Sequence, residues 1–238
     1  LSMTDLHIFD LDETLISGDS SSLFCEFICE QGWMDKSRFL AEETRLMDLY
    51  HKGELLMEDY VKLQIEPLNS LTKPLIDAGI QTFVSQVMLQ KFYPQAVELL
   101  KRIKQQGDEI LVISATVTFL VKPIAALLEL DNVLAIDLVM DENGLPTHEI
   151  AGQVSYREGK VIRLKQWLAE QNREFEHTHF YSDSINDLPL LEYVDFPIVT
   201  NPDEPLTQIA NEKKWPILDW RRDEAISTEI YRSENSTS

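Results

Sequence analysis

The sequence predicts an α/β protein with a doubly wound parallel sheet (a Rossmann-like core) and a helical cap inserted after the first strand. Two observations support this prediction. From about residue 94 onward, short apolar runs typical of strands buried on both faces alternate with amphipathic helical patterns. The stretch between Ser17 and Tyr93, in contrast, shows helical spacing and no strand-like run.

The first strand is expected at residues 6–9, and it leads directly into the acidic segment 10–14. In the insertion, apolar residues recur three and four positions apart, which predicts helices. These residues are Leu23, Phe24, Phe27, Ile28, Leu46, Leu49, Tyr50, Leu56, Tyr60 and Leu63. We therefore expect an α/β catalytic core made of residues 1–16 and 93–238, and a helical cap domain over residues 17–92.

The second half of the chain predicts helices and strands in alternation. Pro94 is suited to the first turn of a helix, and Gly107 to its end. Asp141 to Gly144 form a turn signal, which predicts a hairpin between residues 133 and 154. The last dozen residues are expected to be frayed. The remaining expected elements are strands at 109–113, 178–181, 196–200 and 216–218, and helices through 124–128, from 160 onward and at 205–214.

The composition is strongly acidic and excludes several classes of partner. The 238 residues include 41 Asp and Glu against 21 Lys and Arg, a net charge of −20. Such a surface repels nucleic acid and anionic membranes. No apolar run approaches the length of a membrane span, and no signal segment precedes or follows Met3, the expected native start. We expect a cytoplasmic monomer or homodimer that acts on a small molecule.

The two cysteines indicate neither a disulfide framework nor a metal centre. Cys25 and Cys29 are four positions apart, as on one face of a helix, and no CxxC pair or Cys/His cluster occurs. They are expected to be reduced, half-buried thiols of a cytoplasmic protein.

Polar residues follow the expected strands at the ends where ligands bind in such sheets. They combine carboxylates, hydroxyls and an ammonium group, which suits a hard cation together with a phosphate group. The residues are Asp10, Asp12, Ser114, Thr116, Lys160, Asp183, Asn186 and Asp187.

The segment 10–14 after an apolar strand, then Ser114, Lys160 and the segment 183–187, resemble the haloacid dehalogenase-like hydrolases. The position of the helical insertion resembles the phosphoserine-phosphatase-like branch of that family. The resemblance implies a Mg²⁺-dependent phosphatase that hydrolyses a small phosphomonoester through an aspartyl-phosphate.

The same resemblance implies catalytic roles. Asp10 would be the nucleophile. Asp12 would protonate the leaving alcohol and then activate water. Ser114 and the Ala115 amide would bind the phosphoryl group, and Lys160 would neutralise both the nucleophile and the phosphate.

For the metal, the resemblance implies that Mg²⁺ binds the Asp10 carboxylate, the Asp12 backbone carbonyl and the Asp183 carboxylate. Asp187 would orient metal-bound water or Lys160. Asn186 would reach the phosphate or the leaving group.

Residues of the expected cap indicate which substrate the protein takes. Asp19 lies nine positions after Asp10, where phosphoserine phosphatases place an acidic residue against the substrate amine. Gln64 lies at or near the position of their carboxylate-binding arginine, and neither Arg38 nor Arg45 aligns with it. A buried substrate carboxylate without a cation would be costly. We therefore expect an amino-alcohol phosphate such as histidinol phosphate, with phosphoserine as the alternative.

The sequence leaves two alternative functions open. A phosphomutase would share Asp10 and Asp12 but return the phosphate to a second hydroxyl, and the cap type disfavours it. A phospho-Asp signalling receiver also combines acidic residues, Ser or Thr and Lys on a doubly wound sheet. Receivers are about half this length and carry the acceptor on a later strand, so a catalyst is favoured.

Overall fold

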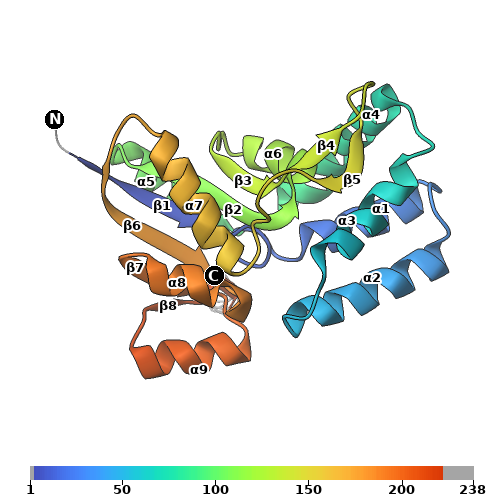
Figure 1. The fold of residues 1–238 in the computed structure, drawn as a ribbon. Helices are drawn as coiled ribbons and strands as arrows, with labels where there is room; N and C mark the ends of the chain where they lie inside the picture. The colour runs from blue at the N-terminus through green and yellow to red at the C-terminus, as the bar shows by residue number, and fades with distance from the viewer. Residues whose placement is uncertain (1–2, 222–238) are drawn as a thin grey trace, which may run out of the picture.

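The computed structural model describes residues 3–221, and its centre is a six-stranded sheet flanked by helices (Figure 1). The strand order is β3-β2-β1-β6-β7-β8, and every neighbouring pair is parallel. The α/β fold predicted from the alternation of strands and helices is confirmed. The strands are β1 (Thr4–Phe9), β2 (Glu109–Val117), β3 (Val133–Ile136), β6 (Phe175–Ser182), β7 (Phe196–Thr200) and β8 (Ile217–Leu218).

Helices cover both faces of the sheet. Alternate residues of β1 point to opposite faces: Phe9 belongs to one buried apolar cluster, and Leu6 and Ile8 belong to another. Helices on the Phe9 face are α5 (Pro94–Gln105) and α6 (Thr118–Ala126). Helices on the other face are α7 (Glu158–Glu170), α8 (Leu188–Tyr193) and α9 (Glu204–Lys213).

The segment between β1 and α5 is helical, and it lies beside the sheet at one end (Figure 1). Asp19 and Asp35 cap its first two helices, since each side chain accepts a hydrogen bond from a backbone amide of the first turn. The helices are α1 (Ser20–Glu30), α2 (Lys36–His51), α3 (Met57–Ile65) and α4 (Lys73–Phe83), followed by the short turns η1 (Glu66–Leu68), η2 (Val84–Met88) and η3 (Leu89–Lys91). The division into core and cap domains stays a prediction.

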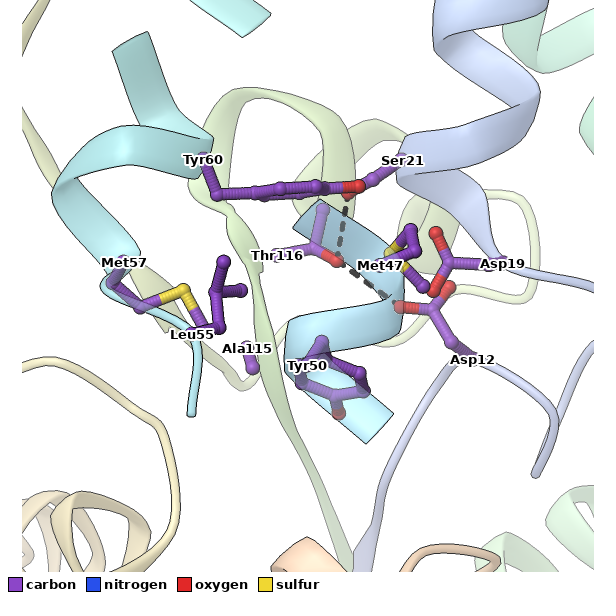
Figure 2. Close-up of a pocket in the computed structure, with 10 residues that line it drawn as sticks. All are labelled: Asp12, Asp19, Ser21, Met47, Tyr50, Leu55, Met57, Tyr60, Ala115 and Thr116. Atoms are coloured by element: carbon purple, nitrogen blue, oxygen red, sulfur yellow. Dashed lines mark hydrogen bonds between the residues drawn. The ribbon is translucent and has the colours of Figure 1, made fainter. Parts of the chain in front are cut away.

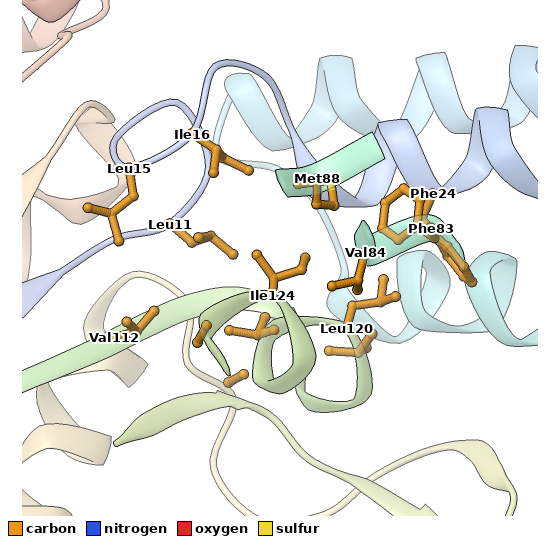
Figure 3. Close-up of a cluster of buried hydrophobic side chains, with 14 of the residues drawn as sticks. Leu11, Leu15, Ile16, Phe24, Phe83, Val84, Met88, Val112, Leu120 and Ile124 are labelled. Carbon is orange, nitrogen blue, oxygen red and sulfur yellow. The ribbon is translucent and has the colours of Figure 1, made fainter. Parts of the chain in front are cut away.

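One apolar cluster joins this helical segment to the sheet. Figure 3 shows Phe24 of α1 and Phe83 of α4 beside Leu120 and Ile124 of α6, with Leu11 close by. All five side chains are at most 1% exposed. Burial of such side chains contributes about 1.5–3 kcal/mol each. The helical segment is therefore fixed to the sheet through α1, α4 and α6.

The structure differs from the predictions in three details. Strand β2 continues beyond residue 113 to Val117. Residues 133–136 form β3 of the main sheet, so the hairpin contains only β4 (Leu138–Met140) and β5 (Pro146–Ile150). Cys25 and Cys29 are free thiols, but they are buried rather than half-buried because both face the interior side of α1. The expected fraying of the last dozen residues concerns residues outside the described part.

Within residues 3–221, no helix combines the length and the apolar character that crossing a bilayer requires.

Candidate active site

The carboxyl ends of the central strands bring the predicted residues to one edge of the sheet. Asp10 and Asp12 follow β1, and Ser114 and Thr116 lie in the last part of β2. Asp183 directly follows β6, and η4 (Ile185–Asp187) comes next. This placement follows from the parallel register, in which Phe9 pairs with both Val112 and Tyr181.

Lys160 lies at the centre of this edge and is 1% exposed. Its Nζ is 3.1 Å from Asp10 Oδ1 and 2.9 Å from Asp187 Oδ1. It also donates to the Ile113 carbonyl at 3.3 Å. Burial alone would lower the pKa of Lys160, but the two carboxylates outweigh it and raise the pKa above its usual value. Lys160 therefore stays charged at neutral pH.

The start of α7 explains how Lys160 reaches this position. Arg157, just before the helix, has a positive φ of 53°, which turns the chain sharply. A Cβ atom on Gly159 would collide with the backbone oxygen of Val154, so only glycine allows this close approach. The turn and the glycine together point the first-turn lysine into the sheet edge.

The acidic groups at this edge outnumber the cations that contact them. The Asp183 carboxyl accepts a hydrogen bond from Thr14 Oγ1 at 3.0 Å. Burial, followed by the nearby Asp10 carboxylate, raises the pKa of Asp183 well above its usual value. Burial also raises the pKa of Asp187 to about 6, although Lys160 acts against this shift. The buried negative charge exceeds what Lys160 neutralises.

This donor set fits Mg²⁺. Asp10 and Asp183 supply carboxylate oxygens close enough to raise the pKa of Asp183, and a divalent cation between them would remove the repulsion. Mg²⁺ prefers oxygen ligands and usually needs only one or two protein carboxylates beside water and phosphate oxygens. The residues that would hold it are Asp10 and Asp183, with the Asp12 carbonyl.

Asp12 is held by two hydrogen bonds from other elements. Its Oδ1 accepts from the Ser20 amide at 2.7 Å, at the start of α1, and its Oδ2 accepts from Thr116 Oγ1 at 3.0 Å. Burial, together with the Asp19 carboxylate, raises the pKa of Asp12 to about 7 despite these bonds. The carboxyl is therefore fixed in orientation, and its proton is available near neutral pH.

Ser114 is fully buried, and its hydroxyl oxygen accepts a hydrogen bond from the Thr116 amide at 3.1 Å. Its carbonyl accepts from Ser155 Oγ at 2.5 Å, which ties β2 to the loop before α7. Ala115 lines a pocket beside Asp12. The phosphoryl-binding roles of Ser114 and Ala115 remain predictions, and their location at the sheet edge is compatible with them.

The pocket beside Asp12 is formed by both the sheet and the helical segment (Figure 2). Asp12 and Asp19 point toward one another on one side, and the Tyr50 and Tyr60 rings line it further round. No Lys, Arg or His is among the residues that line it. These residues are Asp12, Asp19, Ser21, Met47, Tyr50, Leu55, Met57, Tyr60, Ala115 and Thr116.

Asp19 is an unusual carboxylate for a helix N-cap. Its side chain accepts from the Ser22 amide at 2.9 Å, which favours the charged form. Burial is the larger effect, and the carboxylate of Glu43 adds to it, so the pKa of Asp19 is raised to about 6. The site therefore contains a carboxylate that lacks a cation and gains from binding one.

Two hydrogen bonds connect the last turn of α2 and the loop after it to the sheet edge. Asn186 Nδ2 donates to the Tyr50 carbonyl at 2.9 Å, and Arg157 Nη1 donates to the Gly53 carbonyl at 2.9 Å. Asn186 was predicted to reach the phosphate or the leaving group; here its amide nitrogen binds the helical segment, and a substrate contact stays a prediction.

The model of the haloacid dehalogenase-like hydrolase family matches residues 8–192. This chain belongs to that family. Histidinol-phosphatase of Neisseria meningitidis is 34% identical over 222 residues, which is 92% of this chain and 100% of the relative. A phosphoserine phosphatase of Mycobacterium tuberculosis is 24% identical over 93% of this chain and 72% of its own length. The protein is a phosphatase that hydrolyses phosphoric monoesters.

Solved structures agree with this assignment at the level of the fold. A protein of unknown function from Bordetella pertussis Tohama I is 33% identical, with a TM-score of 0.85 over 92% of this chain and 100% of its own. A substrate-bound phosphoserine phosphatase is 18% identical, with a TM-score of 0.65 over 93% of this chain and 97% of its own. The second likeness concerns the fold alone.

Three residues of the site were not assigned a function from the sequence. Thr14 and Thr116 bind the Asp183 and Asp12 carboxyls. Glu43 of α2 is buried near Asp19. Thr116 was predicted to lie at this edge but was given no role; it is two residues after Ser114 on one strand and so points to the same face. Glu43 carries no comparable signal, since an acidic residue on a helix is usually solvated.

Replacing Asp19 by Asn is expected to stabilise the protein at neutral pH but not at pH 4. The folded-state pKa of Asp19 is raised to about 6, above its usual value of 3.8. Its ionised form therefore destabilises the fold increasingly between pH 4 and 6, and constantly above that. We expect Asp19→Asn to gain roughly 1–2 kcal/mol at pH 7.5 in urea denaturation. Equal gains at both pH values would contradict a raised pKa.

Proposed function

We propose that the protein is a Mg²⁺-dependent phosphatase for a small ester with a cationic leaving group and no carboxylate, such as histidinol phosphate. The observation that carries this proposal is the pocket beside Asp12, which offers the Asp19 carboxylate and no cationic side chain. The similarity to a relative named histidinol-phosphatase supports it. We further propose that residues 17–92 act as the cap domain and that the enzyme works in the cytoplasm as a monomer or homodimer.

In the first step, an Asp10 carboxylate oxygen attacks phosphorus and the bond to the leaving-group oxygen breaks. Lys160, 3.1 Å from Asp10, holds this carboxylate in place and offsets negative charge as the phosphoryl group approaches. The Asp12 carboxyl donates its proton to the departing oxygen. The product of the step is a phosphoryl group on Asp10 and a free alcohol.

In the second step, the Asp12 carboxylate accepts a proton from water, and the water oxygen attacks the phosphorus bound to Asp10. This releases inorganic phosphate and regenerates both carboxyl groups. Thr116 and the Ser20 amide keep Asp12 in the orientation that both transfers need. Bound Mg²⁺ would supply positive charge that offsets the repulsion between Asp10 and the phosphoryl oxygens.

Phosphoserine is the second candidate, because several relatives bear the name phosphoserine phosphatase. Its carboxylate would need a cation in the leaving-group pocket. Arg45 of the helical segment is exposed and paired with Glu42, and Arg38 is exposed as well. Neither lines the pocket beside Asp12. The pocket therefore favours a leaving group without a carboxylate.

Replacing Asp10 by Asn is expected to abolish hydrolysis of p-nitrophenyl phosphate, because an amide cannot form the covalent intermediate. We expect kcat to fall by at least about 1,000-fold. Chelation of Mg²⁺ should abolish wild-type activity, and added Mg²⁺ should restore it. An Asp141→Asn variant, at an exposed position of the hairpin turn, should keep wild-type activity. Turnover by Asp10→Asn near the wild-type rate would contradict the assignment of Asp10 as the nucleophile.

The substrate proposal predicts a ranking of esters. At equal concentrations, kcat/KM for histidinol phosphate should exceed that for phosphoserine by about 100-fold or more, because one buried unpaired carboxylate costs several kcal/mol. Phosphate release is the measurement. Faster hydrolysis of phosphoserine would overturn the substrate proposal while leaving the reaction class intact.

A further inference from the structure

The helical segment contains a second buried carboxylate behind the pocket. Glu43, on α2, is 7% exposed. Its Oε1 accepts a hydrogen bond from Ser22 Oγ at 2.6 Å, while the Ser22 amide donates to Asp19 Oδ1 at 2.9 Å. One serine thus bridges the two carboxylates. Glu43 does not line the pocket, whereas Asp19 does, and Met47, one turn further along α2, lines it too.

This pair has no cationic partner in the described part of the chain. Neither Asp19 nor Glu43 takes part in any ion pair there. Burial raises the pKa of both carboxyls, and the Glu43 charge adds to the shift of Asp19. Two neighbouring carboxylates without a counter-charge are destabilising. Such an arrangement is compensated when a cation binds beside it.

A buried amide side chain near the pocket, although not among the residues that line it, also lacks hydrogen-bond partners within residues 3–221. Gln64 of α3 is fully buried, and neither its Nε2 nor its Oε1 has a hydrogen-bond partner among the described residues. Leaving a buried polar group unpaired costs about 1–3 kcal/mol. Gln64 lies one and two turns after Tyr60 and Met57, which line the pocket, so the three share one face of α3.

We propose that Glu43 is a positioning residue that gives the leaving-group pocket its selectivity for cations, acting through Ser22 and Asp19. This deepens the proposed function, on which it rests. Glu43 holds the Ser22 hydroxyl, which keeps the Ser22 amide on Asp19 and presents the Asp19 carboxylate to the pocket. Its charge adds to the negative potential that attracts a leaving group bearing an ammonium or imidazolium.

The same arrangement rejects a zwitterionic leaving group. The carboxylate of phosphoserine would enter a pocket that is lined by the Asp19 carboxylate and has the Glu43 carboxylate behind it. Like charges in a site of low polarity repel strongly, so selectivity comes from repulsion as well as attraction. The hydrolysis of esters with an uncharged leaving group should be independent of Glu43, because that leaving group carries no charge for Glu43 to act on.

The test is Glu43→Gln, which removes the charge and keeps an acceptor for Ser22 Oγ. The KM of histidinol phosphate is expected to rise roughly 10-fold with kcat little changed, since a single nearby charge acts on binding more than on chemistry. The kinetics of p-nitrophenyl phosphate, whose leaving group carries no cationic charge, should stay unchanged. Glu30→Gln, at the exposed end of α1, removes a charge from the same segment and is the matched control with no expected effect.

A second variant, Ser22→Ala, breaks the bridge and keeps both charges, and we expect a smaller rise in the KM of histidinol phosphate alone. Loss of activity toward both esters in parallel would mean that Glu43 is merely structural and would overturn the inference, as would unchanged KM values. Failure of the proposed function is distinguishable from these outcomes, because the wild type would then not hydrolyse histidinol phosphate at all.

Discussion

The site depends on one buried ammonium group. Lys160 joins Asp10 after β1 to Asp187 after β6, and it reaches the Ile113 carbonyl of the strand between α5 and α6. Three separate parts of the chain are thus fixed around one Nζ. Removing one partner of such a buried ion cluster typically costs about 3–5 kcal/mol, because the remaining charge is left unpaired. The position of Lys160 in turn depends on Gly159, whose missing side chain lets the preceding loop approach the helix.

Both halves of the site carry an excess of negative charge. At the sheet edge, Asp10 and Asp187 contact Lys160, and Asp183 adds a third carboxylate beside Asp10, an arrangement that fits a divalent cation. In the pocket beside it, Asp12 and Asp19 meet without a cation, which fits a positively charged leaving group. The proposed substrate, with a dianionic phosphate at one end and a cation at the other, would match this arrangement with the metal bound. Asn186 donates a hydrogen bond to the last turn of α2 and Arg157 donates one to the loop after it, and these bonds keep both halves together.

The features that could be predicted from the sequence are those that local residue patterns determine. The apolar strands, the polar residues at their ends and the helices of the insertion follow from spacing alone, and the sheet edge then brings Asp10, Lys160 and Asp187 together. Residues 133–136 were assigned to the hairpin because a short apolar run does not reveal its partner, and here the partner is β2. The burial of Glu43 and Gln64 could not be predicted, because it results from how α1, α2 and α3 pack.

The central claim is that the phosphoryl group passes through Asp10. The most direct measurement is mass spectrometry of the enzyme after rapid acid quenching during turnover with Mg²⁺ and excess ester. We expect a phosphoryl adduct on the peptide that contains Asp10, absent without substrate and absent in Asp10→Asn. A stable adduct on another residue, or full turnover with no adduct at any quench time and unaltered activity in Asp10→Asn, would contradict the account.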